Sequence, residues 1–224
     1  MQKFAVKAVL IDLDGTLMHT SPEIARAANA MLMSLGKTAL STEVIESFIG
    51  DGAITLIERC LKKQFESFDA ELLEKAKACF FTSYANIVTE SKPYSDALTS
   101  LQNMQSAGFK LACVTNKPTI FTMPLLEKSG LLPYFDMVVC GDTLANKKPD
   151  PEQIYHVCEQ LQFNVQEVVM IGDSKTDIAA AHNAGCYVFA VPYGYNQGVV
   201  IKASEVDAVV NSLSDAIALI EYKH

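Results

Sequence analysis

Two aspartates, Asp12 and Asp14, follow an apolar segment near the start of the chain and stand directly before Gly15. The segment 5–11 is typical of a short parallel strand that is covered on both faces. Ligands of α/β proteins bind at the carboxyl ends of such strands, which is where the two acids fall. At a separation of about 4 Å two carboxylates repel each other by about 4 kcal/mol at an effective dielectric of about 20, so a divalent cation is the expected partner. The alternative is a solvated Asp-x-Asp-Gly turn, and this pair alone does not decide between them.

Three further polar groups follow later apolar segments. The segment 115–118, Thr-Asn-Lys-Pro, offers a hydroxyl and backbone amides at a helix start, which suits an anion, although a simple N-cap is the alternative. Lys148 lies in a loop restricted by two prolines and suits a contact with phosphate, with a solvated basic loop as the alternative, which is favoured for Lys147. Asp173 follows a glycine, and Asp177 lies one helical turn further on, where it can support Asp173 from behind; a helix cap is again the alternative.

Alternating apolar and helical patterns must position these residues. Strands are predicted at residues 109–115, 137–140, 167–171, 187–191 and 208–210. Helices are predicted between and after them, at residues 94–107, 118–128, 151–161, 175–183 and 213–222. This alternation is typical of an α/β fold, with a Rossmann-like parallel sheet flanked by helices.

The stretch between residues 18 and 90 shows helical patterns only, at 21–35, 41–48, 53–65 and 69–88. Because the sheet needs the first strand, this stretch is predicted to be an all-helical cap domain inserted after it. The expected division is a core domain of residues 1–17 and 91–224 and a cap domain of residues 18–90.

Composition narrows the classes of partner. The 224 residues carry a formal net charge of −8, which argues against binding to nucleic acid or to an anionic membrane surface. The sequence shows no stretch long enough to span a bilayer. The six cysteines lack Cys-x-x-Cys spacing, which favours reduced thiols and a cytoplasmic protein. The sequence leaves the choice between monomer and dimer open.

Four groups in this order, each after a predicted strand, resemble the four motifs of the haloacid dehalogenase-like superfamily. The matching residues are Asp12-x-Asp14-Gly15-Thr16, Thr115-Asn116, Lys148-Pro149 and Gly172-Asp173-x-x-x-Asp177. The resemblance covers the whole chain, including the helical insertion. Within the superfamily the chain is most similar to the phosphoglycolate phosphatase group.

The resemblance implies phosphoryl transfer through an aspartyl-phosphate. Asp12 would be the nucleophile, and Asp14 the acid that protonates the leaving alkoxide and later the base for water. Magnesium would be held by Asp12, Asp173 and the backbone carbonyl of Asp14, with Asp177 behind them. Lys148 would balance the charge that builds on the phosphoryl group.

The resemblance also implies a set of substrate contacts. Thr115 and Asn116 would bind phosphoryl oxygens, next to Gly15 and Thr16. Arg59 in the cap would pair with a substrate carboxylate, although a solvated helix face is its alternative. The chain departs from the usual group pattern at His19 to Pro22 and at Asp51, which stands where Asn is common, and both positions border the expected pocket.

The implied substrate is a small phosphorylated metabolite, most consistently 2-phosphoglycolate, which yields glycolate and phosphate. Alternatives are pyrophosphate, a sugar phosphate, a nucleoside monophosphate, or a mutase similar to β-phosphoglucomutase. A dehalogenase needs no acid for a leaving alkoxide, so Asp14 argues against it. A binding module that keeps the fold without turnover is the remaining alternative.

Overall fold

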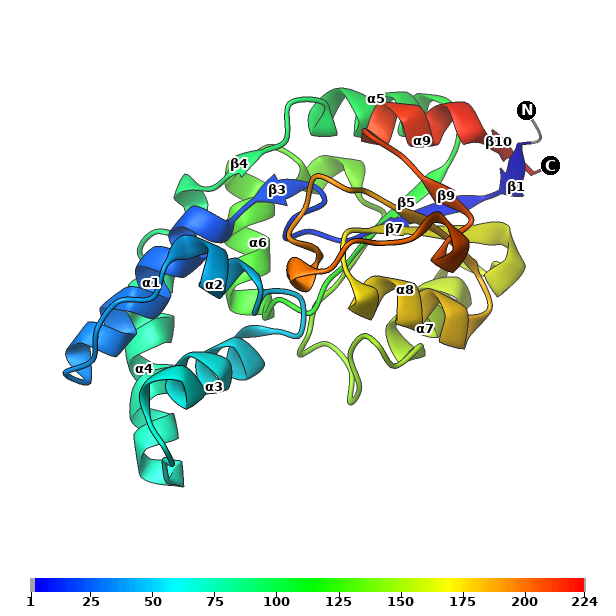
Figure 1. The fold of residues 1–224 in the computed structure, drawn as a ribbon. Coiled ribbons are helices and arrows are strands. Elements are labelled where there is room, and N and C mark those ends of the chain that lie inside the picture. The colour runs from blue at the N-terminus through cyan, green and yellow to red at the C-terminus, as the bar shows by residue number, and fades with distance from the viewer. Residues whose placement is uncertain (1–2, 224) are drawn as a thin grey trace.

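The fold is that of a computed structural model, which describes residues 3–223 except for the side chain of residue 197. Its centre is a six-stranded sheet in which every neighbouring pair is parallel (Figure 1). In spatial order the strands are β6 (Met137–Val139), β5 (Lys110–Val114), β2 (Ala8–Ile11), β7 (Val168–Gly172), β8 (Tyr187–Ala190) and β9 (Ala208–Val209). The predicted parallel α/β sheet is therefore confirmed.

Helices cover both faces of this sheet. Side chains alternate along β2, so that Val9 and Ile11 join one apolar cluster while Ala8 and Leu10 join the other. Figure 1 shows α5 and α9 on one face and α7 and α8 on the opposite face. A further core helix, α6, lies next to the helical lobe. The five helices are α5 (Ala97–Ser106), α6 (Thr119–Lys128), α7 (Glu152–Leu161), α8 (Lys175–Ala184) and α9 (Leu213–Leu219).

A helical cap forms the second lobe, at the left of Figure 1. It contains α1 (Ser21–Ser34), α2 (Thr42–Glu46), α3 (Ala53–Gln64), α4 (Ala70–Ala85) and the short 3-10 helix Val88–Glu90. The chain enters and leaves the cap through two short antiparallel strands, β3 (Met18–His19) and β4 (Lys92–Pro93). The expectation of no strand between residues 18 and 90 is wrong at β3, because two residues are too few to show an alternating pattern.

The two ends of the described chain pair with each other. The predicted strand 5–11 is divided at Lys7, and β1 (Phe4–Val6) lies parallel to β10 (Ile220–Tyr222) instead of joining the central sheet. The last helix accordingly ends at Leu219, three residues earlier than expected. The reason is tertiary pairing between segments more than 200 residues apart, which local periodicity does not encode.

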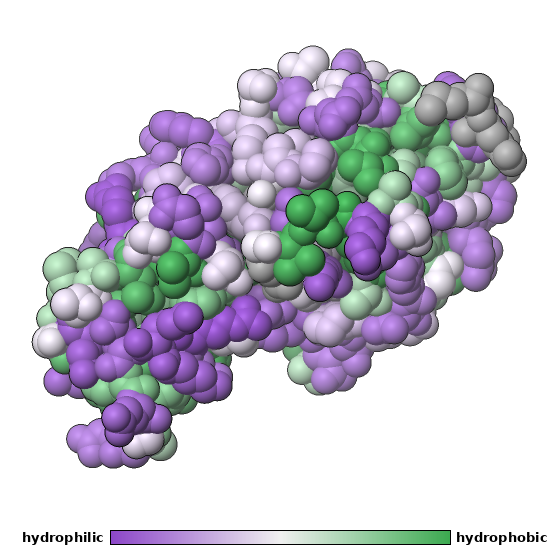
Figure 2. All heavy atoms as spheres, viewed as in Figure 1, coloured by the Kyte–Doolittle hydropathy of each residue, from purple (hydrophilic) through white to green (hydrophobic). Residues whose placement is uncertain are grey.

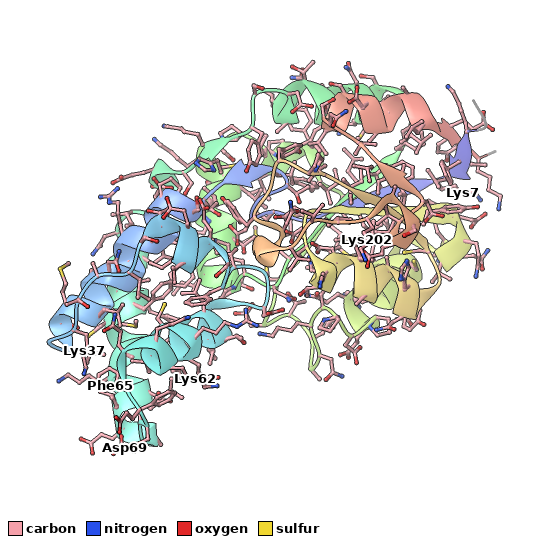
Figure 3. The ribbon with its side chains drawn as sticks, in the orientation of Figure 1. Lys7, Lys37, Lys62, Phe65, Asp69 and Lys202 are labelled. Atoms are coloured by element: carbon pink, nitrogen blue, oxygen red, sulfur yellow. The ribbon has the colours of Figure 1, made fainter. Side chains whose placement is uncertain are left out.

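Polar side chains cover much of both lobes in the view of Figure 2, in keeping with the net charge. At the outer end of the cap, Lys37 lies over the ring of Phe65, with its ammonium 4.1 Å from the ring centroid (Figure 3). Within residues 3–223, no helix combines the length and the apolar character needed to cross a membrane.

Glu167 holds both chain ends against the sheet, since its carboxylate lies 3.3 Å from Lys7 Nζ and 3.1 Å from Lys223 Nζ. The Asn164 backbone N–H and both ammonium groups lower the pKa of Glu167 from 4.5 to about 2. This carboxylate therefore stabilises the fold above pH 4.5, and the stabilisation is lost as the pH falls toward 2.

We expect Glu167→Gln to lower the free energy of unfolding at neutral pH, and urea titrations should show the difference from wild type narrowing as the pH falls below 4.5. A difference that stays constant would contradict this role.

Candidate active site

The carboxyl ends of three neighbouring strands bring the expected residues together. Asp12 follows β2, the central strand of the three, while Thr115 follows β5 on one side and Asp173 follows β7 on the other. The strands are in register, because Ile11 lies opposite Cys113 in β5 and Ile171 in β7. All three functional side chains are buried. The order of the strands thus brings residues more than 150 positions apart in the sequence into one site.

Three acids form a compact group. Asp12, Asp173 and Asp177 each offer a carboxylate oxygen, and these oxygens all lie within 4.8 Å of one another. Asp177 is fixed by the capping box of α8, where its Oδ2 accepts hydrogen bonds from Ser174 N at 3.0 Å and Ser174 Oγ at 2.6 Å. The carboxylate of Asp14 is not a member of this group.

Lys148 is the positive charge inside the group. It comes from the loop after β6 and is 2% exposed. Its ammonium donates to Asp12 Oδ1 at 2.7 Å, to Asp177 Oδ1 at 2.6 Å and to the Val114 carbonyl at 2.6 Å. Burial opposes its positive charge, but the two carboxylates outweigh burial and raise the pKa of Lys148. Lys148 therefore stays charged at the centre of the site.

The two remaining acids resist ionisation when no further cation is near. Burial raises the pKa of Asp12 to about 7, with Lys148 opposing and Asp177 adding to the increase. Burial and the neighbouring carboxylates Asp177 and Asp12 raise the pKa of Asp173 well above its usual value.

The charges of the site favour one more cation. When ionised, the acidic group and Asp14 supply four negative charges against the two ammonium groups of Lys148 and Lys117, which leaves an excess of two. The atoms that would bind a metal are carboxylate oxygens, which suit a hard divalent ion. The residues present therefore fit such an ion at the acidic group.

Asp14 is held by a contact that the sequence reasoning missed. Lys117 Nζ lies 2.9 Å from Asp14 Oδ1 and 3.2 Å from Asp14 Oδ2, and it also donates to the hydroxyl of Tyr84 at 2.6 Å. Tyr84 belongs to α4, so this chain of contacts joins the cap to the acid. Lys117 is part of the Thr-Asn-Lys-Pro segment, but nothing in its spacing indicated which carboxylate it would meet.

The loop after β8 supplies a second contact that was not foreseen. The backbone N–H of Tyr195 donates to Asp173 Oδ2 at 2.6 Å. The Tyr195 hydroxyl accepts hydrogen bonds from the backbone N–H groups of Thr20 and Ser21 at 2.6 and 2.8 Å. Tyr195 therefore links Asp173 to the start of the cap. A Cβ atom at the preceding Gly194 would lie 2.3 Å from Asp173, so that position requires glycine.

Gly15 and Thr16 pack directly against Asp173. Gly15 has a φ of +89°, and a Cβ atom there would lie 2.3 Å from Asp173 Oδ2. Thr16 Oγ1 lies 3.4 Å from Asp173 Oδ1. The Asn116 side chain donates to the carbonyls of Gly50 at 2.9 Å and Lys148 at 2.8 Å, so it joins the cap loop to the core.

Arg59 and Asp51 lie together on the cap. The Arg59 guanidinium forms an ion pair with Asp51 and donates to the Phe48 carbonyl at 3.1 Å. Asp51 in turn accepts a hydrogen bond from Thr176 Oγ1 at 2.7 Å, and its carbonyl accepts one from Lys147 at 2.7 Å. His19 is exposed beside the rings of Tyr94 and Tyr195.

A small cavity of about 40 Å³ lies between cap and core, with Asp12, Asp14, Thr115 and Asn116 on one side. Its other walls are mainly apolar. They are formed by Ile24, Ile49, Gly50, Gly52, Ala53, Leu56, Phe80, Tyr84, Lys117, Pro118 and Phe121. Arg59 is not among the residues that line it. This space holds about three water molecules and suits a small group attached to a phosphate.

Comparison with known proteins agrees with this geometry. The profile of the haloacid dehalogenase-like hydrolase family matches residues 9–191, and the chain belongs to that family. It is 44% identical over 218 residues to a phosphoglycolate phosphatase of Nitrosospira multiformis, and 42% identical over 217 residues to one of Thiobacillus denitrificans. Each alignment covers 96% of both chains.

The similarity extends to solved structures. A crystal structure described as a predicted phosphoglycolate phosphatase from Haemophilus somnus has a TM-score of 0.91 to this chain at 29% identity. The match covers 95% of this chain and 97% of that one. The family resemblance expected from the four motifs is therefore confirmed, together with the fold that it implied.

Proposed function

We propose that this protein is a magnesium-dependent phosphatase that hydrolyses a small phosphomonoester through an aspartyl-phosphate on Asp12. The observation that carries the proposal is the surroundings of Asp12. This carboxylate lies within the acidic group, 2.7 Å from the Lys148 ammonium, and faces the same cavity as Thr115. A buried carboxylate with an adjacent cation and a cavity in front of it suits nucleophilic attack on phosphorus.

Two aspartates divide the covalent steps. An Asp12 oxygen forms a bond to phosphorus as the ester oxygen leaves, and Asp14 gives that oxygen a proton. A water molecule then attacks the phosphorus and breaks the bond to Asp12, while Asp14 takes the proton of that water. Asp14 lines the same cavity as Asp12, as both steps require.

The acidic group is proposed to hold Mg²⁺ through Asp12, Asp173 and the backbone carbonyl of Asp14, with Asp177 supporting them. When bound, the ion would supply charge neutralisation for a phosphoryl group. Asp177 is suited to a supporting role because Ser174 and Lys148 already donate to its carboxylate oxygens.

The phosphoryl oxygens are assigned to Thr115, to the Asn116 backbone amide and to Lys148, with Gly15 and Thr16 shaping the adjacent turn. The cap, proposed as residues 18–90 against a core of residues 1–17 and 91–224, would exclude water and enclose the rest of the substrate. We place the protein in the cytoplasm, acting on a phosphorylated metabolite.

We propose 2-phosphoglycolate as the substrate. The support is the similarity to proteins named phosphoglycolate phosphatase along almost the whole chain, and a small cavity next to Asp12 and Asp14. The test is phosphate release with Mg²⁺ from 2-phosphoglycolate, pyrophosphate, sugar phosphates and nucleoside monophosphates side by side. The highest kcat/KM is expected for 2-phosphoglycolate. A higher value for any other compound overturns the substrate, and no release from any of them overturns the phosphatase.

Magnesium binding should depend on pH in a defined direction. Because the pKa of Asp12 is raised from 3.8 to about 7, the folded protein without metal binds more protons than the unfolded chain in that range, so its free energy of unfolding falls as the pH rises. The ion must displace these protons. The Tm increase caused by Mg²⁺ should therefore be larger at about pH 8 than at about pH 5.5, and Asp173→Asn should remove most of it. Equal increases at both pH values would contradict the site.

A further inference from the structure

One basic side chain reaches the cavity between cap and core. Among the described residues that line the cavity, Lys117 carries the single positive charge. The walls around it are apolar, with Leu56 and Phe80 from the cap and Phe121 from the core. A hydroxyl-rich leaving group would find few hydrogen-bond partners on such walls, and burying unpaired hydroxyls is unfavourable. A buried anionic group, in contrast, would share the Lys117 ammonium with Asp14.

One contact of Lys117 is long enough to be exchanged for a contact with such a group. Its side chain is 3% exposed, and within the described part of the chain its ammonium has two partners, the Asp14 carboxylate and the Tyr84 hydroxyl. An ammonium has three N–H donors, and three acceptors lie within reach of this one: Asp14 Oδ1 at 2.9 Å, Asp14 Oδ2 at 3.2 Å and the Tyr84 hydroxyl at 2.6 Å. The contact with Asp14 Oδ2 is the longest of the three, and it is the one that a substrate carboxylate would replace.

Tyr84 provides a second donor at the same place. Its oxygen accepts a hydrogen bond from Lys117, and an ammonium cannot accept one in return, so the hydroxyl hydrogen of Tyr84 remains available for another acceptor. Burial raises the pKa of Tyr84 well above its usual value, which keeps that hydrogen in place. Lys117 and Tyr84 together thus offer two donors and a positive charge to one anionic oxygen pair.

We propose that Lys117, supported by Tyr84, binds a carboxylate on the leaving group and thereby selects small carboxylate-bearing monoesters. This inference rests on the proposed phosphatase function, and it identifies the side chain that recognises the substrate of that reaction. It assigns the contact to Lys117, which lines the cavity, in place of Arg59, which does not line it and whose guanidinium is paired with Asp51. Two further cap cations, Lys37 and Lys62, are labelled in Figure 3 and lie toward the outer end of the cap.

The test compares two esters that differ only in the group of interest: 2-phosphoglycolate and 2-hydroxyethyl phosphate, in which CH2OH replaces the carboxylate. The readout is the ratio of their kcat/KM values. If the loss of the Lys117 contact impairs Asp14, the rates for both esters fall together, and this effect cancels in the ratio. Wild type should favour phosphoglycolate, and Lys117→Met should reduce the preference by about 10- to 100-fold, the value of a charge-assisted hydrogen bond. Tyr84→Phe should reduce it less, and Arg59→Gln, the matched loss of a cap cation, should leave it unchanged.

Two results would overturn the inference: an unchanged ratio in Lys117→Met, or a ratio that falls in Arg59→Gln alone. A binding measurement separates this inference from the proposed function. Asp12→Asn protein with Mg²⁺ should bind phosphoglycolate more tightly than hydroxyethyl phosphate, and Lys117→Met added to it should remove the difference. If wild type hydrolyses neither ester but this difference depends on Lys117, the carboxylate site stands and the proposed reaction fails. No difference in binding overturns the carboxylate site.

Discussion

Replacement of Asp12 by Asn is expected to abolish turnover, with kcat reduced about 10,000-fold or more, as for the loss of a nucleophile in other enzymes. The amide has nearly the same shape, but it lacks the negative charge and nucleophilic oxygen needed to form a bond to phosphorus. The measurement is phosphate release from 2-phosphoglycolate at saturating Mg²⁺, with wild type and variant prepared in parallel.

The fold should survive this change. Lys148 keeps Asp177 and the Val114 carbonyl as partners when the charge at position 12 is removed. Urea unfolding of Asp12→Asn is therefore the control, and a midpoint near that of wild type would attribute the lost activity to chemistry. Retention of more than about a tenth of wild-type kcat would contradict a nucleophilic Asp12.

Replacement of Lys148 by Met is expected to affect both stability and activity. The ammonium is buried between Asp12 and Asp177, and its removal leaves two buried carboxylates without their partner. Breaking a buried ion pair in this way costs about 3–5 kcal/mol of unfolding free energy. Phosphate release should also be lost, because the ammonium that we propose to contact the phosphoryl group is then absent. Urea titration and phosphate release measure the two effects.

The neighbouring lysine is a matched control. Lys147 is half-buried and donates to the backbone carbonyl of Asp51. Lys147→Met therefore also removes one positive charge, but it leaves no buried pair of carboxylates without a partner. Its effect on the free energy of unfolding should be clearly smaller. Equal destabilisation by the two substitutions would show that Lys148 has no special role in the acidic group.

The elements that position the site could be predicted from the sequence because each is encoded locally. The strands that end before Asp12, Thr115 and Asp173 are short apolar runs followed by polar residues, and helix signals separate them. The pairing of β1 with β10 is different, because no feature of the sequence around Phe4 or Ile220 indicates that these two segments pair with each other. Local patterns therefore predict the central six-stranded sheet but not the two-stranded sheet of β1 and β10.

The candidate site divides in the same way. The acids of the motifs were identified because their type and their place at strand ends are visible in the sequence. The Lys117–Asp14 pair and the hydrogen bond from Tyr195 to Asp173 were not, because each joins segments that meet only after the sheet and cap have assembled. Tyr84 lies in an amphipathic helix, where a buried aromatic is the ordinary expectation, and only its contact with Lys117 reveals a polar role.

The most direct test of the account is to trap the phosphorylated enzyme. Protein mixed with 2-phosphoglycolate and Mg²⁺ is quenched during turnover and treated with borohydride, which reduces an acyl phosphate of aspartate to homoserine. Peptide mass mapping should then find homoserine at position 12, and none in protein quenched without substrate. Homoserine at another aspartate, or its absence from protein that is turning over, would contradict a covalent intermediate on Asp12.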